Sequence, residues 1–416
     1  ETPGALPALV AAVAAGGATA SPSLQCAAAN SAAVLAEIAD AGPELSQRVV
    51  EAPHALAALT AALAAGSATA TPSLQDAAQN SAAALGFIAR AGPELAWQVA
   101  QVRGALPTLV AAVAAGGTAA VPSLQNAAVN SAAALAYISR AGPAFARRMA
   151  EVPGALAALA SAIAVGTAAA APILHNMTRD CAEALAMIAG ADQQLSWRVA
   201  EVPGALAALA AAVAAGGAAD APSLQDATGN CVAALGTIAE ADPELARRVA
   251  EVPGALAALA AAVSVGGAAA AASLHVAAAN SARALGMIAE ADLQLAWRVA
   301  ERPGALASLV AAVAAGGTAA VASLQAVAAN SAEALGLIAE ADSEIARRVA
   351  EEPGALATLV AAIATGGAAA SPSLQDVGRH SADVLGAIAD AGPALARCVA
   401  GVPGALATLV AAVAVG

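Results

Sequence analysis

The sequence has no lysine and few aromatic residues. All 17 basic residues are arginine, and the 416 residues include three Trp, one Tyr and two Phe. Sixty per cent of the residues are nevertheless apolar, and most of these are alanine. A core with so few aromatic side chains favours helices that approach each other closely on small residues. The length would suit about two or three ordinary globular domains, but the composition argues against them.

Positive charge is also scarce, because the formal net charge is −13. Proteins that bind a phosphate backbone carry basic patches or stripes, so we expect no nucleic-acid partner, and an RNA-reading helical repeat is disfavoured. The uncharged runs are rich in alanine and are interrupted by Gly-Gly, Pro, Asn and Gln. We therefore expect no membrane span and no membrane partner. The first residues show no signal-peptide pattern.

The residues that usually carry chemistry are few and scattered. Cys181 and Cys231 share one place in successive copies of the repeat described below, but stacked helices lie about 8–10 Å apart, too far for a disulfide. Free thiols indicate a reducing, cytoplasmic compartment. The four histidines have no Cys or carboxylate at ligand spacing, so we expect no metal: His54, His175, His275 and His380. No serine can be nominated for a Ser-His-Asp set, and the Gly-Gly pairs follow no strand. We expect neither a cofactor nor an enzyme.

What the chain does contain is a repeat of 50 residues without insertion or deletion. A period of this size indicates a solenoid, in which each unit buries its apolar face only against its neighbours. We number positions 1 to 50 within each repeat, so that position 30 of repeat 2 is Asn80. The prediction is a single solenoid over 1–416, with these repeats: 1–50, 51–100, 101–150, 151–200, 201–250, 251–300, 301–350 and 351–400, and a partial repeat at 401–416.

Each repeat has the pattern of three helices. Leu at positions 6 and 9, with a β-branched residue or Leu at 13, predicts a helix with one buried stripe that ends at the glycine of position 16. A second helix is predicted from about Leu24 to Ile38, capped by Ser or Thr near Pro22. A short helix follows, with Pro43 in its first turn. Arg48 and its equivalents are expected to pair with the glutamate that opens the next repeat.

Two phrases resemble armadillo repeats, a family with three helices per unit: AEIADAGPELSQRVVEAPHALAAL at 36–59 and GALPALVAAV at 4–13. The resemblance covers every repeat, although the unit is longer than the usual length of about 40–47 residues. It implies an all-α fold, a right-handed α-solenoid of about eight 50-residue armadillo-like three-helix repeats. The amino-acid sequence of 36–59 is most similar to the armadillo protein of the flagellar central pair.

This resemblance implies a non-catalytic protein–protein interaction scaffold within a large assembly, with other proteins as partners. The narrower likeness implies an axonemal central-apparatus component in a cilium or flagellum, part of the cytoskeleton. The alternative is a soluble cargo or signalling adaptor that binds an extended peptide on its concave face. Importin-type Trp and Asn ladders are missing, which argues against a nuclear-import groove. Neither end carries a polar capping repeat, so we expect a segment of a longer protein or ends covered by other chains.

Acidic tubulin tails would repel a chain of this charge. We therefore expect any microtubule link to use partner proteins or an arginine edge formed by Arg147, Arg148, Arg247 and Arg248.

Differences between the repeats indicate which positions are exposed. Positions 26, 29, 33, 37, 40, 43 and 47 vary, and 26, 30, 33 and 37 fall on one stripe of the second helix, which in an armadillo superhelix lines the concave side. Position 30 is occupied by a row of amides, with Asp180 and His380 in the two other full repeats: Asn30, Asn80, Asn130, Asn230, Asn280 and Asn330. These side chains either bind the backbone of a partner or fix the stacking of neighbouring repeats.

Two further rows are candidate binding residues. Position 37 carries an apolar row that marks a protein-binding site, unless neighbouring helices cover it: Phe87, Tyr137, Met187, Met287 and Leu337. Position 47 carries tryptophan in alternate repeats: Trp97, Trp197 and Trp297. These either anchor a partner or stack on an arginine of the adjacent repeat.

Overall fold

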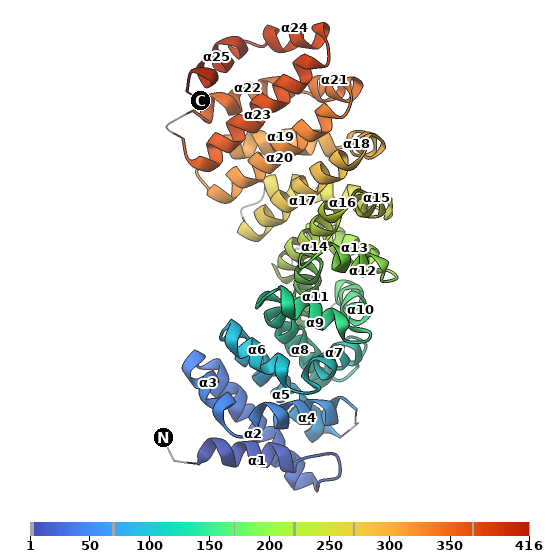
Figure 1. Cartoon of the computed structure of the whole chain (residues 1–416), viewed down its shortest axis with the longest axis vertical. Helices are drawn as coiled ribbons and strands as arrows, with labels where there is room; N and C mark the ends of the chain where they lie inside the picture. The colour runs from blue at the N-terminus through green and yellow to red at the C-terminus, as the bar shows by residue number, and fades with distance from the viewer. Residues whose placement is uncertain are drawn as a thin grey trace. The chain divides into compact units, whose positions relative to one another are not determined.

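The computed structural model describes residues 4–68, 71–169, 171–218, 222–268, 271–367 and 370–415. Throughout these ranges the regular elements are α-helices (Figure 1). The chain divides into two compact units, Glu1–Ala208 (unit 1) and Leu209–Gly416 (unit 2), and the division falls within α13 (Ala205–Ala218). The predicted three-helix repeat is confirmed inside each unit. A single solenoid over the whole chain stays a prediction.

Each full repeat contributes a first helix, a long helix and a short helix. The first helices are α1 (Ala5–Ala15), α4 (Ala55–Ser67), α7 (Ala105–Gly116), α10 (Ala155–Ala168), α13 (Ala205–Ala218), α16 (Ala255–Ala268), α19 (Ala305–Gly317), α22 (Ala355–Thr365) and α25 (Ala405–Val415). The long helices are α2 (Pro22–Asp40), α5 (Pro72–Arg90), α8 (Pro122–Arg140), α11 (Pro172–Ala189), α14 (Pro222–Ala241), α17 (Ala272–Ala291), α20 (Ala322–Glu340) and α23 (Pro372–Asp390). The short helices are α3 (Pro43–Glu51), α6 (Pro93–Gln101), α9 (Pro143–Glu151), α12 (Gln193–Glu201), α15 (Pro243–Glu251), α18 (Leu293–Ala300), α21 (Ser343–Glu351) and α24 (Pro393–Gly401).

The core runs through the stacked first and long helices. In unit 1, α5 packs on α2, α4 and α8; in unit 2, α17 packs on α14, α16 and α20. The leucines at positions 9 and 35 and the isoleucine at position 38 are the same in every full repeat and are fully buried in repeats 2 to 7; Leu59, Leu85 and Ile88 are examples. Alanine fills the spaces between them, so burial is divided among many small side chains rather than a few aromatic ones.

The glycine at position 16 ends the first helix in repeats 1, 3 and 8, where α1, α7 and α22 stop at it or directly before it, but not in the other full repeats, which corrects the prediction there. Helices α4, α10, α16 and α19 continue past it. A Cβ atom added to Gly316 would lie 2.2 Å from the Leu324 carbonyl oxygen and 2.6 Å from Ala328 Cβ. The residue is therefore glycine because the first and long helices of one repeat cross at this point, closer than any side chain permits.

The long helix starts at Pro22 and ends at Asp40, two residues beyond each predicted end. Proline occupies the first turn, as predicted, but the proposed Ser and Thr caps are mostly wrong. Ser371 Oγ accepts a hydrogen bond from the Leu374 backbone N–H at 3.4 Å. Ser21 lies instead 3.1 Å from the hydroxyl of Ser23.

A polar side chain at position 25 fixes the loop before the long helix in repeats 1, 3, 4, 7 and 8. Gln125 and Gln325 each donate a hydrogen bond from Nε2 to the carbonyl at position 19 of the same repeat, both at 2.8 Å. His175 replaces the glutamine in repeat 4, and its Nε2 lies 3.0 Å from the Ala169 carbonyl oxygen. His175 therefore takes the role of the glutamine, which the sequence did not reveal.

No single helix among the described residues is long and apolar enough to cross a bilayer. Seven pairs of consecutive helices reach the length and apolarity together, each pair bent by 76° to 93°.

Candidate interaction surface

The variable stripe predicted from the sequence lies on the long helices. We call the side chains at positions 33, 37 and 40 of these helices the long-helix face, and describe it separately for each unit. Position 40 was outside the predicted stripe, but it lies next to position 37 one turn away. Position 29 corrects the prediction of exposure in part, because Val129 is only 8% exposed there, whereas the Arg379 side chain at the same position is exposed.

The asparagines at position 30 join neighbouring repeats. Asn80 donates its side-chain N–H to the Ala29 carbonyl oxygen at 3.0 Å, and Asn330 does so to Ala279 at 3.0 Å. Asn130 makes the equivalent contact with Gln79 at 3.5 Å. The stacking interpretation therefore holds at these junctions. A partner-binding role stays a prediction for the whole row.

In unit 1 an arginine guanidinium stacks on the ring of each aromatic residue at position 37. The Arg90 guanidinium is 5.0 Å from the ring centre of Phe87 and 2.5 Å from the Asp40 carboxylate. Tyr137 has the same arrangement: Arg140 lies 5.6 Å from its ring centre and pairs with Glu183 of the next repeat. Unlike these two, Met187 is 40% exposed. The position-37 row of unit 1 is thus apolar, and the arginines that stack on it form ion pairs with carboxylates of the chain itself.

In unit 2 the same face is mainly acidic. Met287 and Leu337 are half-buried at position 37, and Leu337 packs over Gly286 of the preceding repeat. Arg283 pairs with Glu240 at 2.6 Å. The other charged residues at positions 33 and 40 are all carboxylates: Glu290, Glu333, Glu340, Asp383 and Asp390.

A pocket of about 600 Å³ opens on this face between repeats 7 and 8. Its lining includes four carboxylates, Glu340, Asp342, Asp383 and Asp390, together with Ser343 and small residues. His380 lies beside these groups, with its Nδ1 3.9 Å from Asp383 Oδ2. The pocket is therefore a region of negative potential.

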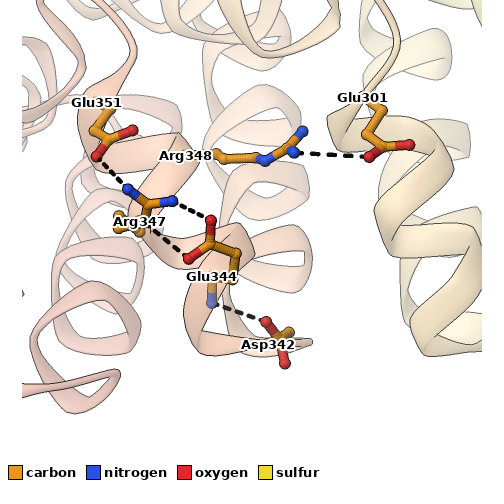
Figure 2. A network of polar contacts seen from close by, with 6 residues as sticks. All are labelled: Glu301, Asp342, Glu344, Arg347, Arg348 and Glu351. Atoms are coloured by element: carbon orange, nitrogen blue, oxygen red, sulfur yellow. Dashed lines mark hydrogen bonds and ion pairs between the residues drawn. The ribbon is translucent and has the colours of Figure 1, made fainter.

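The tryptophan row lies on the short helices. Arg348 of repeat 7 stacks 4.8 Å above the ring centre of Trp297 of repeat 6, which confirms the stacking interpretation at this position. The Arg348 guanidinium also lies 3.6 Å from the Glu301 carboxylate, an ion pair drawn in Figure 2. Trp97 is 45% exposed, and partner binding by Trp97, Trp197 and Trp297 stays a prediction.

At position 48, Arg148, Arg198 and Arg298 contact the preceding repeat rather than the glutamate that opens the next one, which corrects the prediction for these three residues. Arg148 donates to the Ala100 carbonyl oxygen at 3.1 Å, and Arg298 does so to Ala250 at 2.9 Å. These carbonyls lie at the C-terminal end of a short helix, where a cation is favoured by the helix dipole. The Arg148 guanidinium thus stabilises stacking inside unit 1.

Aspartate at position 42 is a structural residue that the sequence analysis missed. Asp192 Oδ1 accepts a hydrogen bond from the Leu195 N–H at 2.9 Å at the start of α12, and Asp292 does so from Leu295 at 2.9 Å at the start of α18. The Arg147 guanidinium, 2.8 Å from Asp192 Oδ2, lowers the pKa of Asp192, and the Leu195 N–H adds to the effect. An Asp directly before a short amphipathic helix is the signal that predicts this cap.

Arg247 holds Asp292 in the same way, at 2.6 Å, and lowers its pKa. The arginine edge predicted for a microtubule link is therefore bound, at Arg147, Arg148 and Arg247, to groups of the chain itself. Figure 2 shows a related network on α21, in which Arg347 pairs with Glu344 and with Glu351.

Structure comparison supports one fold. A designed armadillo repeat protein in complex with the peptide (KR)4 is 22% identical with a TM-score of 0.50, and the match covers 68% of this chain and 99% of that one. A chain from a study of the phosphorylation switch between cadherin and beta-catenin is 14% identical with a TM-score of 0.63, over 94% of this chain and 63% of that one. The fold is the armadillo solenoid.

An engineered protein is also similar, with 17% identity and a TM-score of 0.55 over 97% of this chain and 93% of that one. No family model and no curated protein sequence matches the chain. The predicted all-α solenoid of armadillo-like repeats is thus confirmed by structure. These structural neighbours provide no link to the flagellar central pair.

Among the described armadillo repeats, no group of three or more His, Cys, Asp or Glu side chains is placed to hold a metal ion. The Cys231 thiol is buried, and burial raises its pKa to about 12, so it stays protonated at neutral pH and is a poor nucleophile. The candidate interaction features of the described repeats are therefore the charged side chains at positions 33 and 40 and the apolar row at position 37.

Proposed function

We propose that the chain is a protein-interaction scaffold whose unit 2 binds a basic, extended polypeptide segment along its long-helix face. The observation that carries the proposal is the surplus of carboxylates at positions 33 and 40 of unit 2. Within the described residues, Glu290, Glu333, Glu340 and Asp390 form no ion pair, whereas the single arginine of this face, Arg283, is paired with Glu240.

Unit 1 provides the contrast. Its face carries three carboxylates and two arginines, and both arginines are bound in ion pairs with carboxylates of neighbouring repeats. The charges of unit 1 are therefore largely satisfied within the chain. In unit 2, like-charged groups lie close together with no internal partner, an arrangement that costs stability and is relieved by a cationic ligand.

The shape of such a ligand follows from the repeat. Neighbouring long helices lie about 8–10 Å apart, and an extended chain advances about 3.3–3.6 Å per residue. A basic side chain at every second or third residue would thus meet carboxylates on successive repeats. Met287 and Leu337, between the carboxylates, offer apolar surface to the aliphatic stems of Lys and Arg.

The (KR)4 peptide bound by the designed armadillo protein is a ligand of this chemistry. At 22% identity that likeness speaks for the fold, so the proposal rests on the carboxylates of this chain.

The test is fluorescence anisotropy with a labelled peptide of alternating Lys and Arg. We expect saturable binding that weakens with added salt. Each exposed carboxylate contributes about 0.2–1 kcal/mol, so the triple variant Glu340→Gln, Asp383→Asn and Asp390→Asn should bind roughly tenfold more weakly.

The matched control neutralises three carboxylates on the short-helix side, Glu201→Gln, Glu251→Gln and Glu351→Gln, which changes the net charge equally. This control should bind nearly as the parent does. Equal loss in both variants, or equal binding of a peptide with Gln at every basic position, would show that the long-helix face of unit 2 is not the site.

We also propose, from the likeness of 36–59 to the armadillo protein of the flagellar central pair, that the assembly containing this scaffold is axonemal. The adaptor alternative predicts a soluble protein that carries a short peptide. Co-purification with axonemes and loss on deciliation would support the axonemal proposal. Recovery as a soluble peptide complex with no axonemal fraction would support the adaptor.

A further inference from the structure

Asp180 interrupts the asparagine row inside unit 1. Where an asparagine of this row contacts the preceding repeat, its amide N–H donates to the backbone carbonyl at position 29 of that repeat, as Asn80 does to Ala29 at 3.0 Å. Aspartate has the shape of asparagine but no N–H to donate. An ionised carboxylate would face a carbonyl oxygen, and two acceptors repel each other.

The environment of Asp180 is closed to water. Asp180 is 5% exposed, and its Oδ1 accepts a hydrogen bond from Arg179 Nε at 2.8 Å. Its other oxygen, Oδ2, is buried without a hydrogen-bond partner. By analogy with the asparagines, the group that corresponds to Asp180 in the preceding repeat is the backbone carbonyl of Val129, and Val129 is itself buried. A buried acceptor without a donor is costly, and one added proton would remove the defect.

The charges around Asp180 do not supply a second donor. Arg179 and Glu183 act on it from α11, and Arg140 acts from α8 but is paired with Glu183. Helix α10 carries no titratable side chain.

On the short helices beside α11, the arginines have other partners, and the carboxylates Glu151 and Glu201 are the last residues of α9 and α12. Arg147 of α9 binds Asp192, Arg148 binds the Ala100 carbonyl, and Arg198 of α12 binds the Ala150 carbonyl at 2.6 Å.

We propose that Asp180 forms a proton-dependent contact between repeats 3 and 4: with a proton taken from solvent, its carboxyl O–H donates to the Val129 carbonyl oxygen, and loss of that proton breaks the contact. The junction then tightens on acidification and loosens as the pH rises. Unit 1 thus contains one junction whose strength is set by pH, among junctions that amides hold at every pH.

The direction follows from linkage. Burial raises the pKa of Asp180, and the hydrogen bond from Arg179 opposes this only in part. A carboxyl whose pKa is higher in the folded chain than in the unfolded chain stabilises the fold fully below the unfolded value of about 4. That contribution is lost as the pH rises through the folded value.

The test is hydrogen exchange of α8 and α11 amides in the whole chain between pH 4 and pH 8, corrected for intrinsic exchange rates. Asp180→Asn restores the permanent donor. The ratio of protection in the variant to protection in the parent should be close to one at pH 4 and about tenfold at pH 8. A ratio that does not change with pH would overturn the proposal.

A reciprocal variant separates this effect from general repacking. Asn80→Asp places the same carboxyl between repeats 1 and 2, and should give α2 and α5 the pH dependence that α8 and α11 lose in Asp180→Asn. Carbon-13 titration of the carboxyl provides a second readout. Ionisation of Asp180 at or below the ordinary value of about 4 would also overturn the proposal.

Discussion

The hydroxyl at repeat position 31 is buried without a hydrogen-bond partner in five repeats: Ser81, Ser131, Ser281, Ser331 and Ser381. In repeats 4 and 5 the same place is filled by Cys181 and Cys231, both buried. A thiol loses less than a hydroxyl when it leaves water, because its hydrogen bonds to water are weaker. The position therefore requires a small side chain rather than a polar one.

A substitution at Ser281 tests this conclusion. Ser281→Ala removes an unpartnered buried hydroxyl, so we expect the free energy of unfolding to stay level or to rise by up to about 1 kcal/mol. Denaturant unfolding, with exchange of α17 amides as a local readout, measures the change.

The matched control is Ser196, which is equally buried but donates a hydrogen bond to the Ala189 carbonyl oxygen at 2.7 Å. Ser196→Ala should cost about 1 kcal/mol. A similar loss in Ser281→Ala would mean that its hydroxyl has a partner in solution, for example a buried water.

The helices of a repeat are held together by close approach as much as by apolar area. The first and long helices cross at a glycine in every full repeat, and an added Cβ there would lie within 2.6 Å of an atom of the facing helix. The adjacent glycine at position 17 meets no such obstacle. At Gly317 the nearest atom to an added Cβ is Ala362 Cβ at 3.9 Å.

This pair of neighbouring glycines gives a second prediction. Gly316→Ala forces α19 away from the Leu324 carbonyl and should destabilise the chain by about 1–3 kcal/mol. Gly317→Ala should instead stabilise it by about 0.5–1 kcal/mol, because alanine favours the helix. The two thermal midpoints should move in opposite directions. If both fell, the flexibility of the glycine pair, and not the crossing, would be the requirement.

In each of the two units of the molecule, the packing contacts of a repeat are with its immediate neighbours, so stability should behave as a sum of local terms. The consequence is that damage stays local. In Gly316→Ala, amide protection should fall in repeats 6 to 8 and remain at the parent value in repeats 1 to 3. Hydrogen exchange followed by mass spectrometry measures this. A uniform loss over all repeats would instead indicate that the whole chain unfolds as one cooperative unit.

The partners of the long polar and charged side chains could not be fixed from the sequence alone. Arg48 and its equivalents were expected to pair with the following glutamate, but Arg148 and Arg298 bind carbonyls of the preceding repeat. For Asn80 and Asn330 the sequence left partner binding and stacking open, and the structure shows the stacking contact with the neighbouring repeat. A long polar side chain reaches several groups of similar chemistry, and the stacking geometry decides which one is near.

The sequence by itself determined the 50-residue unit, its three helices and the leucine and isoleucine core, because these depend on apolar periodicity and on proline and glycine placement within one repeat. Tertiary structure decided the role of the position-16 glycine, the ion pairs that cover Phe87 and Tyr137, and the surplus of carboxylates on unit 2. These features join residues of different helices, often about 50 positions apart, and a local pattern carries no record of which surfaces meet.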